Sequence, residues 1–549
     1  HRDELLYNIY KMGKNAIQKG ERDNWGLTPK FSAEITKLAQ AAQPATPRTE
    51  EGGGAGEGRQ RSTIPLKLYD SVLKKPAYRD ARGYIVPANQ PDFATATRFV
   101  NTLIASGMIV QKATADFTIG TKLYPVGSFV IATNQAFRPH ILDMFEPQDH
   151  PNDFLYPGGP PIAPYDAAGW TLAYQMGVQF DKIIDAFTGP FERIAYGQLQ
   201  PLKGTVATIG KPVGYLLNAR ANNAFAIAND LLKKGIDVFR TTDSVYNNFS
   251  KGSFFIPAVA KTKNEVEKAI IGFGVDAVTL AKKPLNLTKI APARIALWDN
   301  YGGSMPSGWM RLILEQYHFA ADIIYAKDID TGNLKTKYDV IIFVGGAIPT
   351  LTTTGRAGLA GLGEPKADSI PEEYRNRLGK ITATKSIPQL KQFLEDGGNI
   401  ITIGSSTNLA YHLRLPVNNA LTETVNGLER TLPGEKYYIP GSILKVSVDS
   451  TEQGAWGMPS QADVYFDASP VFNILPEGQA KGSIKPLAWF ADGQSLRSGW
   501  AWGQSYLSGG VAAFKATVGK GTLYAFGPEI TFRAQPYGTF KFLFNGLYK

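Results

Sequence analysis

The sequence predicts a multidomain α/β protein, in which two similar α/β modules precede a doubly wound, parallel-sheet domain with a β-rich insertion. Three observations support this prediction. A chain of 549 residues is too long for one ordinary hydrophobic core. Two stretches repeat the same order of strand, loop, helix and strand. From residue 293 onward, strand patterns alternate with helical ones, an order typical of a parallel sheet.

The first 65 residues predict a helical segment followed by a linker. Residues 3–20 carry apolar side chains at near-helical spacing, so we expect an amphipathic helix that ends near Gly20. We expect residues 1–40 to be the terminal helical segment of a preceding domain that this chain does not contain. Residues 41–65 combine Pro, Ala, Gly and mixed charges without apolar periodicity, which predicts a flexible linker or long loop.

An internal repeat predicts the two α/β modules. RGYIVPANQPDFATATRFVNTLIASGMIVQKAT (82–114) and PVGYLLNARANNAFAIANDLLKKGIDVFRTT (212–242) both read as strand, loop, amphipathic helix, glycine and strand. Gly83 and Gly214, which open the two repeats, lie 214 − 83 = 131 residues apart. A duplicated unit is the simplest explanation for this similarity.

We place the first module at 66–203, with a Pro- and aromatic-rich loop, and the second at 204–290. Gly107 and Gly235 follow the two helices at equivalent positions. Glycine commonly ends a helix in the left-handed conformation, so these glycines require no ligand to explain them.

The third domain is expected at 291–549, with a β-rich insertion at about 416–505. Its strand and helix patterns alternate as far as NIITIGSS, and the insertion then brings short strand patterns and loops. VGKGT (518–522) lacks the upstream glycine of a phosphate-binding loop and predicts a hairpin turn. A last strand and a final amphipathic helix would complete the sheet.

Composition excludes several classes of protein. The chain has no cysteine, which excludes disulfides, thiolate metal sites and a cysteine nucleophile. The 58 Lys and Arg residues exceed the 48 Asp and Glu residues by 10, but no basic run marks a nucleic-acid interface. No apolar run reaches the ~18 residues of a membrane-spanning helix. We therefore expect no nucleic-acid partner and no membrane span.

The chain opens with His1 and Glu4, whose H-x-x-E spacing is that of a pair of zinc ligands on a helix. A catalytic zinc site also needs a third ligand and a general base or acid. None of the other four histidines lies in a motif that would complete the site. The start of a surface helix is the favoured interpretation.

The segment RPHILDMFEPQDHPNDF contains the densest group of possible metal ligands. Carboxylates and imidazoles this close could bind calcium or zinc, or they could stabilise a loop through turn capping. The spacing matches no recognised ligand motif, so we favour a structural role and assign no metal site. The residues are His140, Asp143, Glu146, Asp149, His150 and Asp153.

FVGG (343–346) and TIGSSTN (402–408) follow strands, where doubly wound folds place their ligand sites. Ser405 could therefore be a nucleophile. Its surroundings lack the G-x-S-x-G pattern, and neither His318 nor His412 has an identifiable acid partner. We favour a cap or turn serine, and we assign no catalytic and no cofactor-binding residue.

Four stretches together resemble a known family: RDELLYNIYKMGKNAI, YIVPANQPDFATATRFVNTLI, FRPHILDMFEPQDHPNDFLYPGGPPIAPYDAAGWTLAYQMGVQFD and RAQPYGTFKFLFNGLY. They resemble the region that follows the catalytic domain in large secreted bacterial zinc carboxypeptidases of the carboxypeptidase A-like family. The resemblance places this chain after the zinc ligands and the general base of that family. It implies that His1 and Glu4 are not the zinc pair, and that zinc belongs only to the missing catalytic domain.

The region from 293 to the end also resembles glutamine-amidotransferase-like α/β domains. Active members of that family use a cysteine nucleophile, which this chain lacks. The resemblance therefore implies a packing or binding module.

We expect a non-catalytic accessory region of a secreted or periplasmic zinc-carboxypeptidase-like protein, which positions a substrate, a surface or a partner. The expected partners are its own catalytic domain, copies of itself, and a peptide substrate in the intact protein. The alternative is a self-assembling structural extracellular protein, in which exposed aromatic patches form the contacts between copies. A hydrolase that uses Ser405 is a third hypothesis.

Overall fold

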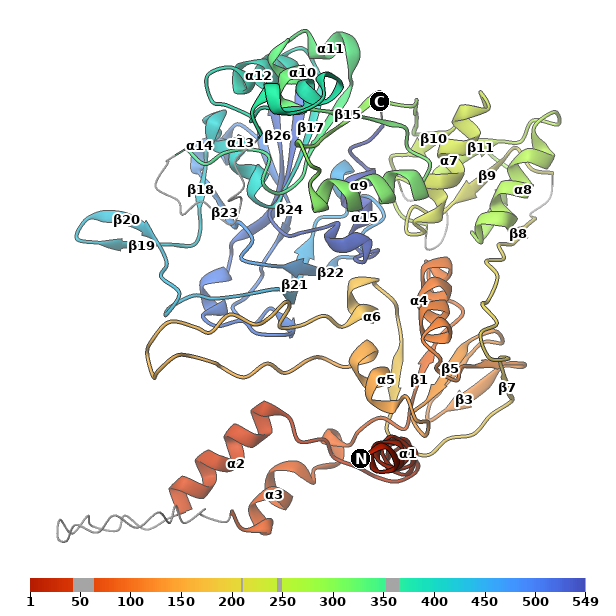
Figure 1. Cartoon of the computed structure of the whole chain (residues 1–549). Coiled ribbons are helices and arrows are strands. Elements are labelled where there is room, and N and C mark those ends of the chain that lie inside the picture. The colour runs from red at the N-terminus through yellow and green to blue at the C-terminus, as the bar shows by residue number, and fades with distance from the viewer. Residues whose placement is uncertain (43–63, 209–210, 244–248, 352–364, 549) are drawn as a thin grey trace.

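The computed structural model describes residues 1–42, 64–208, 211–243, 249–351 and 365–548. Figure 1 shows the N-terminal helices at one end of the molecule, the first module beside them, and the second module next to the large C-terminal domain. The fold is multidomain and mixed α/β, as the sequence predicts. No helix in these ranges is both long enough and apolar enough to cross a membrane.

The N-terminal segment is helical, and its first helix contacts the first module. Ala16 and Gly20 of α1 are buried, and a guanidinium nitrogen of Arg82 donates a hydrogen bond to the Gly20 carbonyl at 3.0 Å. Most of the expected linker at 41–65 lies outside the described residues. The helices are α1 (Arg2–Glu21), α2 (Pro29–Ala42) and α3 (Leu66–Leu73).

The first module is a five-stranded antiparallel sheet in the order β6-β1-β5-β2-β7. Helix α4 connects β1 to β2, and the Asp92 side chain caps its start by accepting a hydrogen bond from the N–H of Thr95. The elements are β1 (Gly83–Val86), α4 (Phe93–Ala105), β2 (Gln111–Ala113), β3 (Phe117–Ile119), β4 (Lys122–Tyr124), β5 (Phe129–Ala132), α5 (Arg138–Phe145), α6 (Leu172–Gln175), β6 (Asp181–Ile183) and β7 (Phe191–Arg193).

The second module repeats this topology. Its strand order β12-β9-β11-β10-β13 corresponds strand for strand to β6-β1-β5-β2-β7 of the first module, and β8 adds a sixth strand, parallel to β12, at the edge. The predicted duplication is therefore present in the fold. The elements are β8 (Val206–Ala207), β9 (Gly214–Leu217), α7 (Asn223–Lys233), β10 (Phe239–Thr241), β11 (Phe254–Pro257), α8 (Lys263–Phe273), β12 (Ala277–Leu280) and β13 (Leu287–Lys289).

The predicted helix-ending glycines have the expected backbone conformation. Gly107 after α4 has a φ of 91°, and Gly235 after α7 has a φ of 72°. Residues with a Cβ adopt this region only at a cost, which explains why glycine stands at both equivalent positions.

One half of the C-terminal domain is the predicted parallel sheet, in the order β15-β14-β16-β17-β27. The central strands are buried along their whole length, as expected when helices cover both faces. The elements are β14 (Ile295–Trp298), α9 (Met305–Gln316), β15 (Ala321–Ile324), α10 (Ala326–Asp330), α11 (Leu334–Lys337), β16 (Val340–Phe343), α12 (Ser386–Glu395), β17 (Asn399–Ile403) and β27 (Gly521–Phe526).

The other half is antiparallel and continues the same sheet through β26, β24, β21 and β22. The predicted β-rich insertion thus mostly extends the sheet, and VGKGT forms the predicted turn between β26 and β27. The elements are α13 (Leu409–His412), β18 (Val417–Asn419), β19 (Thr422–Val425), β20 (Leu428–Thr431), β21 (Ser442–Val448), β22 (Gln461–Phe466), β23 (Phe472–Ile474), α14 (Pro476–Ala480), β24 (Ile484–Trp489), β25 (Leu496–Ser498) and β26 (Val511–Val518).

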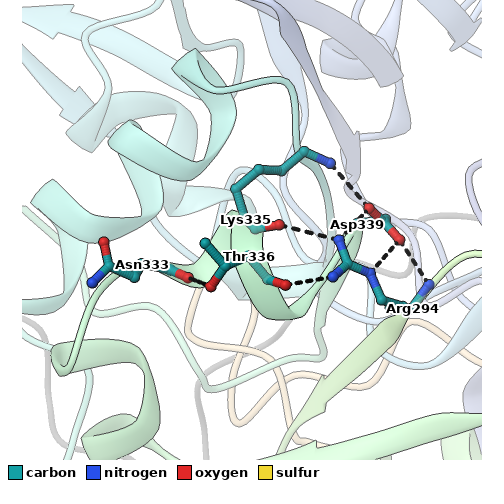
Figure 2. A network of polar contacts seen from close by, with 5 residues as sticks. All are labelled: Arg294, Asn333, Lys335, Thr336 and Asp339. Atoms are coloured by element: carbon teal, nitrogen blue, oxygen red, sulfur yellow. Dashed lines mark hydrogen bonds and ion pairs between the residues drawn. The ribbon is translucent and has the colours of Figure 1, made fainter.

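An ion-pair network joins β14 to β16 at the edge where both strands begin (Figure 2). The Asp339 carboxylate is buried and accepts hydrogen bonds from the Arg294 backbone N–H at 3.0 Å and from its guanidinium at 2.9 Å. Arg294 also donates to the carbonyls of Lys335 and Thr336. These bonds satisfy a carboxylate that would otherwise be costly to bury.

The prediction of a final amphipathic helix is wrong. Helix α15 (Phe540–Phe544) has only five residues, and all of them are buried. It lies between the second module and the C-terminal domain, where Phe544 packs 5.1 Å from Phe225 and 4.7 Å from Tyr317, measured between ring centroids. The two units therefore share one continuous apolar core.

Candidate functional site

The candidate site lies at the carboxyl edge of the parallel sheet, where β14, β16, β17 and β27 end side by side. The strand that follows β14 in the sequence, β15, lies on one side of it, and the next strand, β16, lies on its other side. The direction of strand addition therefore reverses between β14 and β16. Open α/β sheets bind ligands at such a switch point. FVGG and TIGSSTN lie at this edge, as the sequence predicts.

The two serines after β17 tie this segment to the segment after β16. Ser405 Oγ accepts a hydrogen bond from the Gly346 N–H at 2.8 Å. Buried Ser406 Oγ accepts from the N–H groups of Ala347 at 3.1 Å and Ile348 at 3.3 Å, and it donates to the Val344 carbonyl. Both hydroxyls therefore stabilise the loop after β16.

Ser405 has no catalytic partner within the described part of the chain, where its hydroxyl bonds neither a histidine nor a carboxylate. His412 Nε2 lies 2.9 Å from the Pro349 carbonyl oxygen. His318 does have an acid partner, contrary to the sequence analysis, because its Nδ1 lies 2.5 Å from Asp230 Oδ1 of α7. That pair connects the second module to the end of α9.

Glu529 follows β27, which ends at Phe526, and its side chain reaches into the same edge. A Cβ added to Gly404 would lie 2.2 Å from its Oε1, and one added to Gly345 would lie 3.4 Å away. Burial, together with the charge of Asp467, raises the pKa of Glu529 to about 7. No hydrogen bond from the side chain or backbone of another described residue reaches this carboxyl group.

The loop after β14 completes this edge. Asp299 Oδ1 accepts hydrogen bonds from the N–H groups of Asn300 at 2.8 Å and Ser304 at 2.7 Å, and Ser304 caps α9. Trp298 Nε1 and Asn300 Oδ1 are buried polar atoms with no hydrogen-bond partner in the described ranges. Unsatisfied buried polar atoms are uncommon and often lie at functional sites.

Chemically, this edge offers the carboxyl groups of Glu529 and Asp299 and two glycine-rich turns. It lacks the hydrogen-bonded pair of nucleophile and base that acyl transfer requires, as far as the described residues extend.

Glu529 is the residue that sequence reasoning missed. Its only signal was an acidic residue in G-P-E directly after the last parallel strand, which places it at the same edge as the two serine and glycine motifs. The carboxyl-edge rule, applied to every strand, would have found it.

The six possible metal ligands near 140–153 do not assemble. Among the described residues, no three His, Asp or Glu side chains form a group able to hold a metal ion. Glu146 accepts a hydrogen bond from Tyr84 Oη and pairs with Lys182 at 2.9 Å, while Asp149 accepts the Lys30 N–H at 2.7 Å. His150 stacks on Trp500.

The other members of that segment lie apart from these contacts. Burial raises the pKa of Asp143, and the nearby His140 acts in the opposite direction. The neighbouring Asn152 accepts a hydrogen bond from Trp500 Nε1 at 2.9 Å. The backbone carbonyl of Asp153 accepts a hydrogen bond from the Ile162 N–H at 2.9 Å. The segment fixes a loop against the C-terminal domain.

His1 and Glu4 form an exposed pair, with Nδ1 and Oε2 3.4 Å apart. An i, i+3 pair on a helix surface reaches this distance without a metal.

We expect Ser405→Ala to lower the free energy of unfolding by only about 1 kcal/mol, because one hydrogen bond at an exposed position is lost. Ser406→Ala is the matched comparison and should cost about twice as much, since it leaves the buried Ile348 N–H unpaired and the Ala347 N–H with only a 3.4 Å bond to the Val344 carbonyl. Denaturant unfolding of both variants measures the difference. A loss of a hydrolytic activity in Ser405→Ala alone would contradict the structural role.

Comparisons with known proteins do not place the chain in a family. No family model matches it, and no curated protein matches it. Solved structures similar to part of the chain include a β-galactosidase from Bacillus circulans sp. alkalophilus, with 12% identity over 45% of this chain, 30% of the enzyme's length and a TM-score of 0.25.

Two smaller structures align over most of their own length. A GMP synthase-like protein from Thermoplasma acidophilum has 15% identity, covering 46% of this chain and 94% of its own, with a TM-score of 0.26. A ThuA-like protein from Bacteroides uniformis has 10% identity, covering 48% and 94%, with a TM-score of 0.27. Likeness at this level does not establish a shared family or activity.

Proposed function

We propose that the chain is a non-catalytic accessory region of a secreted protein similar to zinc carboxypeptidases, which positions a substrate, a surface or a partner. In this proposal the zinc site belongs to a catalytic domain outside these 549 residues. The C-terminal domain acts as a glutamine-amidotransferase-like module that binds or packs without the cysteine nucleophile of that family.

The observation that carries the proposal is the surface of α1. Leu5, Leu6, Tyr7, Ile9, Tyr10 and Met12 are each 55–70% exposed. The second half of the helix is anchored to the first module through Ala16 and Gly20. Large apolar side chains grouped on one exposed element mark contact surfaces. A further folded unit, such as the proposed catalytic domain, would cover them.

The carboxyl edge of the sheet also supports a non-catalytic role. Ser405 holds the loop after β16, and Glu529 has no nucleophile bonded to it in the described ranges. A binding or packing module requires no more than this.

We expect the purified chain, supplied with Zn²⁺, to release no C-terminal residue from a peptide and to retain no stoichiometric zinc after dialysis. The physical reason is that a catalytic zinc needs three protein ligands and an open position. Peptide hydrolysis followed by mass spectrometry and zinc analysis of the same sample test this. Zinc-dependent release of C-terminal residues by this chain would overturn the proposal.

Sedimentation distinguishes the alternative, a self-assembling structural protein. If the apolar surface of α1 packs against a second copy of the chain, the sedimenting mass will increase with protein concentration. The double variant Leu6→Asp and Ile9→Asp should abolish this increase. Asn15→Asp and Gln18→Asp, at exposed polar positions of the same helix, are the controls for the two added negative charges. A chain that stays monomeric at all concentrations contradicts self-assembly and agrees with the accessory role.

A further inference from the structure

A cavity of about 530 Å³ lies between the first module and the C-terminal domain. Tyr174 and Phe180 of the first module form one wall, and Pro459, Asp463 and Arg497 of the C-terminal domain form the other. Helix α6 contacts β22 beside it. Its volume is in the range of small-molecule sites, which often lie at domain interfaces.

Arg497 is held in one orientation at this cavity. Its Nε donates a hydrogen bond to Asp463 Oδ1 at 3.1 Å, and its guanidinium carbon lies 4.6 Å from the centre of the Tyr174 ring. No other described residue accepts a hydrogen bond from its two terminal nitrogens, and the side chain is 41% exposed. Because a stacked ring and one carboxylate hold this guanidinium, its two terminal nitrogens can donate a pair of parallel hydrogen bonds to a planar anion.

The aromatic wall is rigid because it continues the core of the first module. Tyr174 stacks on Phe180 with ring centroids 6.0 Å apart, and Phe180 meets Phe145 edge-on at 4.9 Å. Phe145 is buried in that core. An apolar group of a ligand would therefore find a preformed surface beside the Arg497 guanidinium.

The charges favour a ligand with a single negative charge. Lys182 lines the cavity, but its Nζ already pairs with Glu146 at 2.9 Å. Asp463 is only 19% exposed, and its burial raises its pKa although Arg497 acts in the opposite direction. A dianion such as phosphate would face the Asp463 carboxylate without using the apolar wall, whereas a carboxylate with an apolar group uses both walls.

We propose that this cavity binds a small carboxylate ligand that carries an aromatic group. The carboxylate accepts hydrogen bonds from the terminal nitrogens of Arg497, and the apolar group lies against Tyr174 and Phe180. This proposal does not depend on the proposed accessory function.

The test uses 3-phenylpropionate and its uncharged amide as probes of the full chain, with binding measured by titration calorimetry. We expect the carboxylate to bind at least about tenfold more tightly than the amide, because a charge-assisted bidentate pair contributes more than a neutral hydrogen bond. Inorganic phosphate should displace neither probe. Equal binding of carboxylate and amide, displacement by phosphate, or no saturable binding of the carboxylate would each overturn the proposal.

Two variants assign the binding to this cavity. Arg497→Gln should weaken 3-phenylpropionate about tenfold and leave the amide unchanged, whereas Tyr174→Leu, which keeps the Arg497 ion pair, should weaken both probes. Arg430→Gln removes an exposed arginine that pairs with Glu423 on the β19–β20 hairpin and serves as the matched control. Unchanged binding of the carboxylate in both Arg497→Gln and Tyr174→Leu would overturn the assignment.

Discussion

Glu529→Gln is expected to stabilise the C-terminal domain by about 3 kcal/mol at pH 8 and to have almost no effect at pH 4. Burial raises the pKa of Glu529 from its ordinary value of 4.5 to about 7. The folded domain must therefore ionise a carboxyl group that has no hydrogen-bond donor among the described residues. Glutamine keeps the shape of the neutral acid and removes the cost of ionisation.

The direction of the pH dependence follows from proton binding. Between about pH 4.5 and pH 7 the folded state retains the proton of Glu529, whereas the unfolded chain has released it. The contribution of this group to stability is thus fully present below its unfolded pKa and is lost as the pH rises through about 7. Glu529→Gln should flatten this part of the stability profile.

Urea unfolding of the two proteins between pH 4 and pH 8 measures the effect. Glu477→Gln, at an exposed glutamate of α14, is the matched control for a lost negative charge. Parallel stability profiles for wild type and Glu529→Gln would contradict a protonated Glu529 in the folded protein.

The sequence predicted the duplicated modules well because their signals are local. Apolar periodicity marked both strands and helices, and Gly107 and Gly235 marked the helix ends. The identical strand order of the two sheets could not be read from these patterns, since β5 inserts between β1 and β2 from a later part of the chain.

Long-range pairing explains what the sequence analysis missed in the C-terminal domain. The strands of the predicted insertion join the main sheet because β24 pairs with β26, and local strand patterns carry no information on such partners. Helix α15 is buried on every side because two units enclose it, so amphipathic periodicity was the wrong expectation.

The same argument applies to the candidate site. The strand-end rule located Ser405 and the glycine turn at Gly346, which meet across 59 residues of sequence. The pKa of Glu529 is raised only because folding buries its carboxyl group beside Gly404. His318 contacts Asp230, which lies 88 residues away in the sequence. Such properties arise from packing rather than from spacing.

Arg240→Ala is expected to lower the free energy of unfolding by about 4 kcal/mol, because it opens a cavity between the second module and the C-terminal domain. Arg240 is 4% exposed, and its guanidinium carbon lies 4.5 Å from the Phe254 ring and 5.4 Å from the Trp456 ring. Its Nη2 donates to Asn545 Oδ1 at 2.9 Å. The side chain therefore joins the two units.

Arg240→Met separates packing from charge. Burial lowers the pKa of Arg240 to about 10, and within the described residues no carboxylate pairs with it, so its charge is held at a desolvation cost. Methionine fills much of the space without that cost, and we expect it to change stability by less than about 1 kcal/mol. Packing of the side chain against the surrounding rings, rather than its charge, would then account for the contribution of Arg240 to stability.

Calorimetry of the full chain distinguishes these outcomes. Because the apolar core is continuous between the two units, wild type should unfold them together, whereas Arg240→Ala should split the transition or move it to lower temperature. The exposed Arg430→Ala serves as control. If Arg240→Met destabilises the protein as much as Arg240→Ala, the charge itself holds the interface, and the hydrogen bond to Asn545 becomes its main stabilising contact.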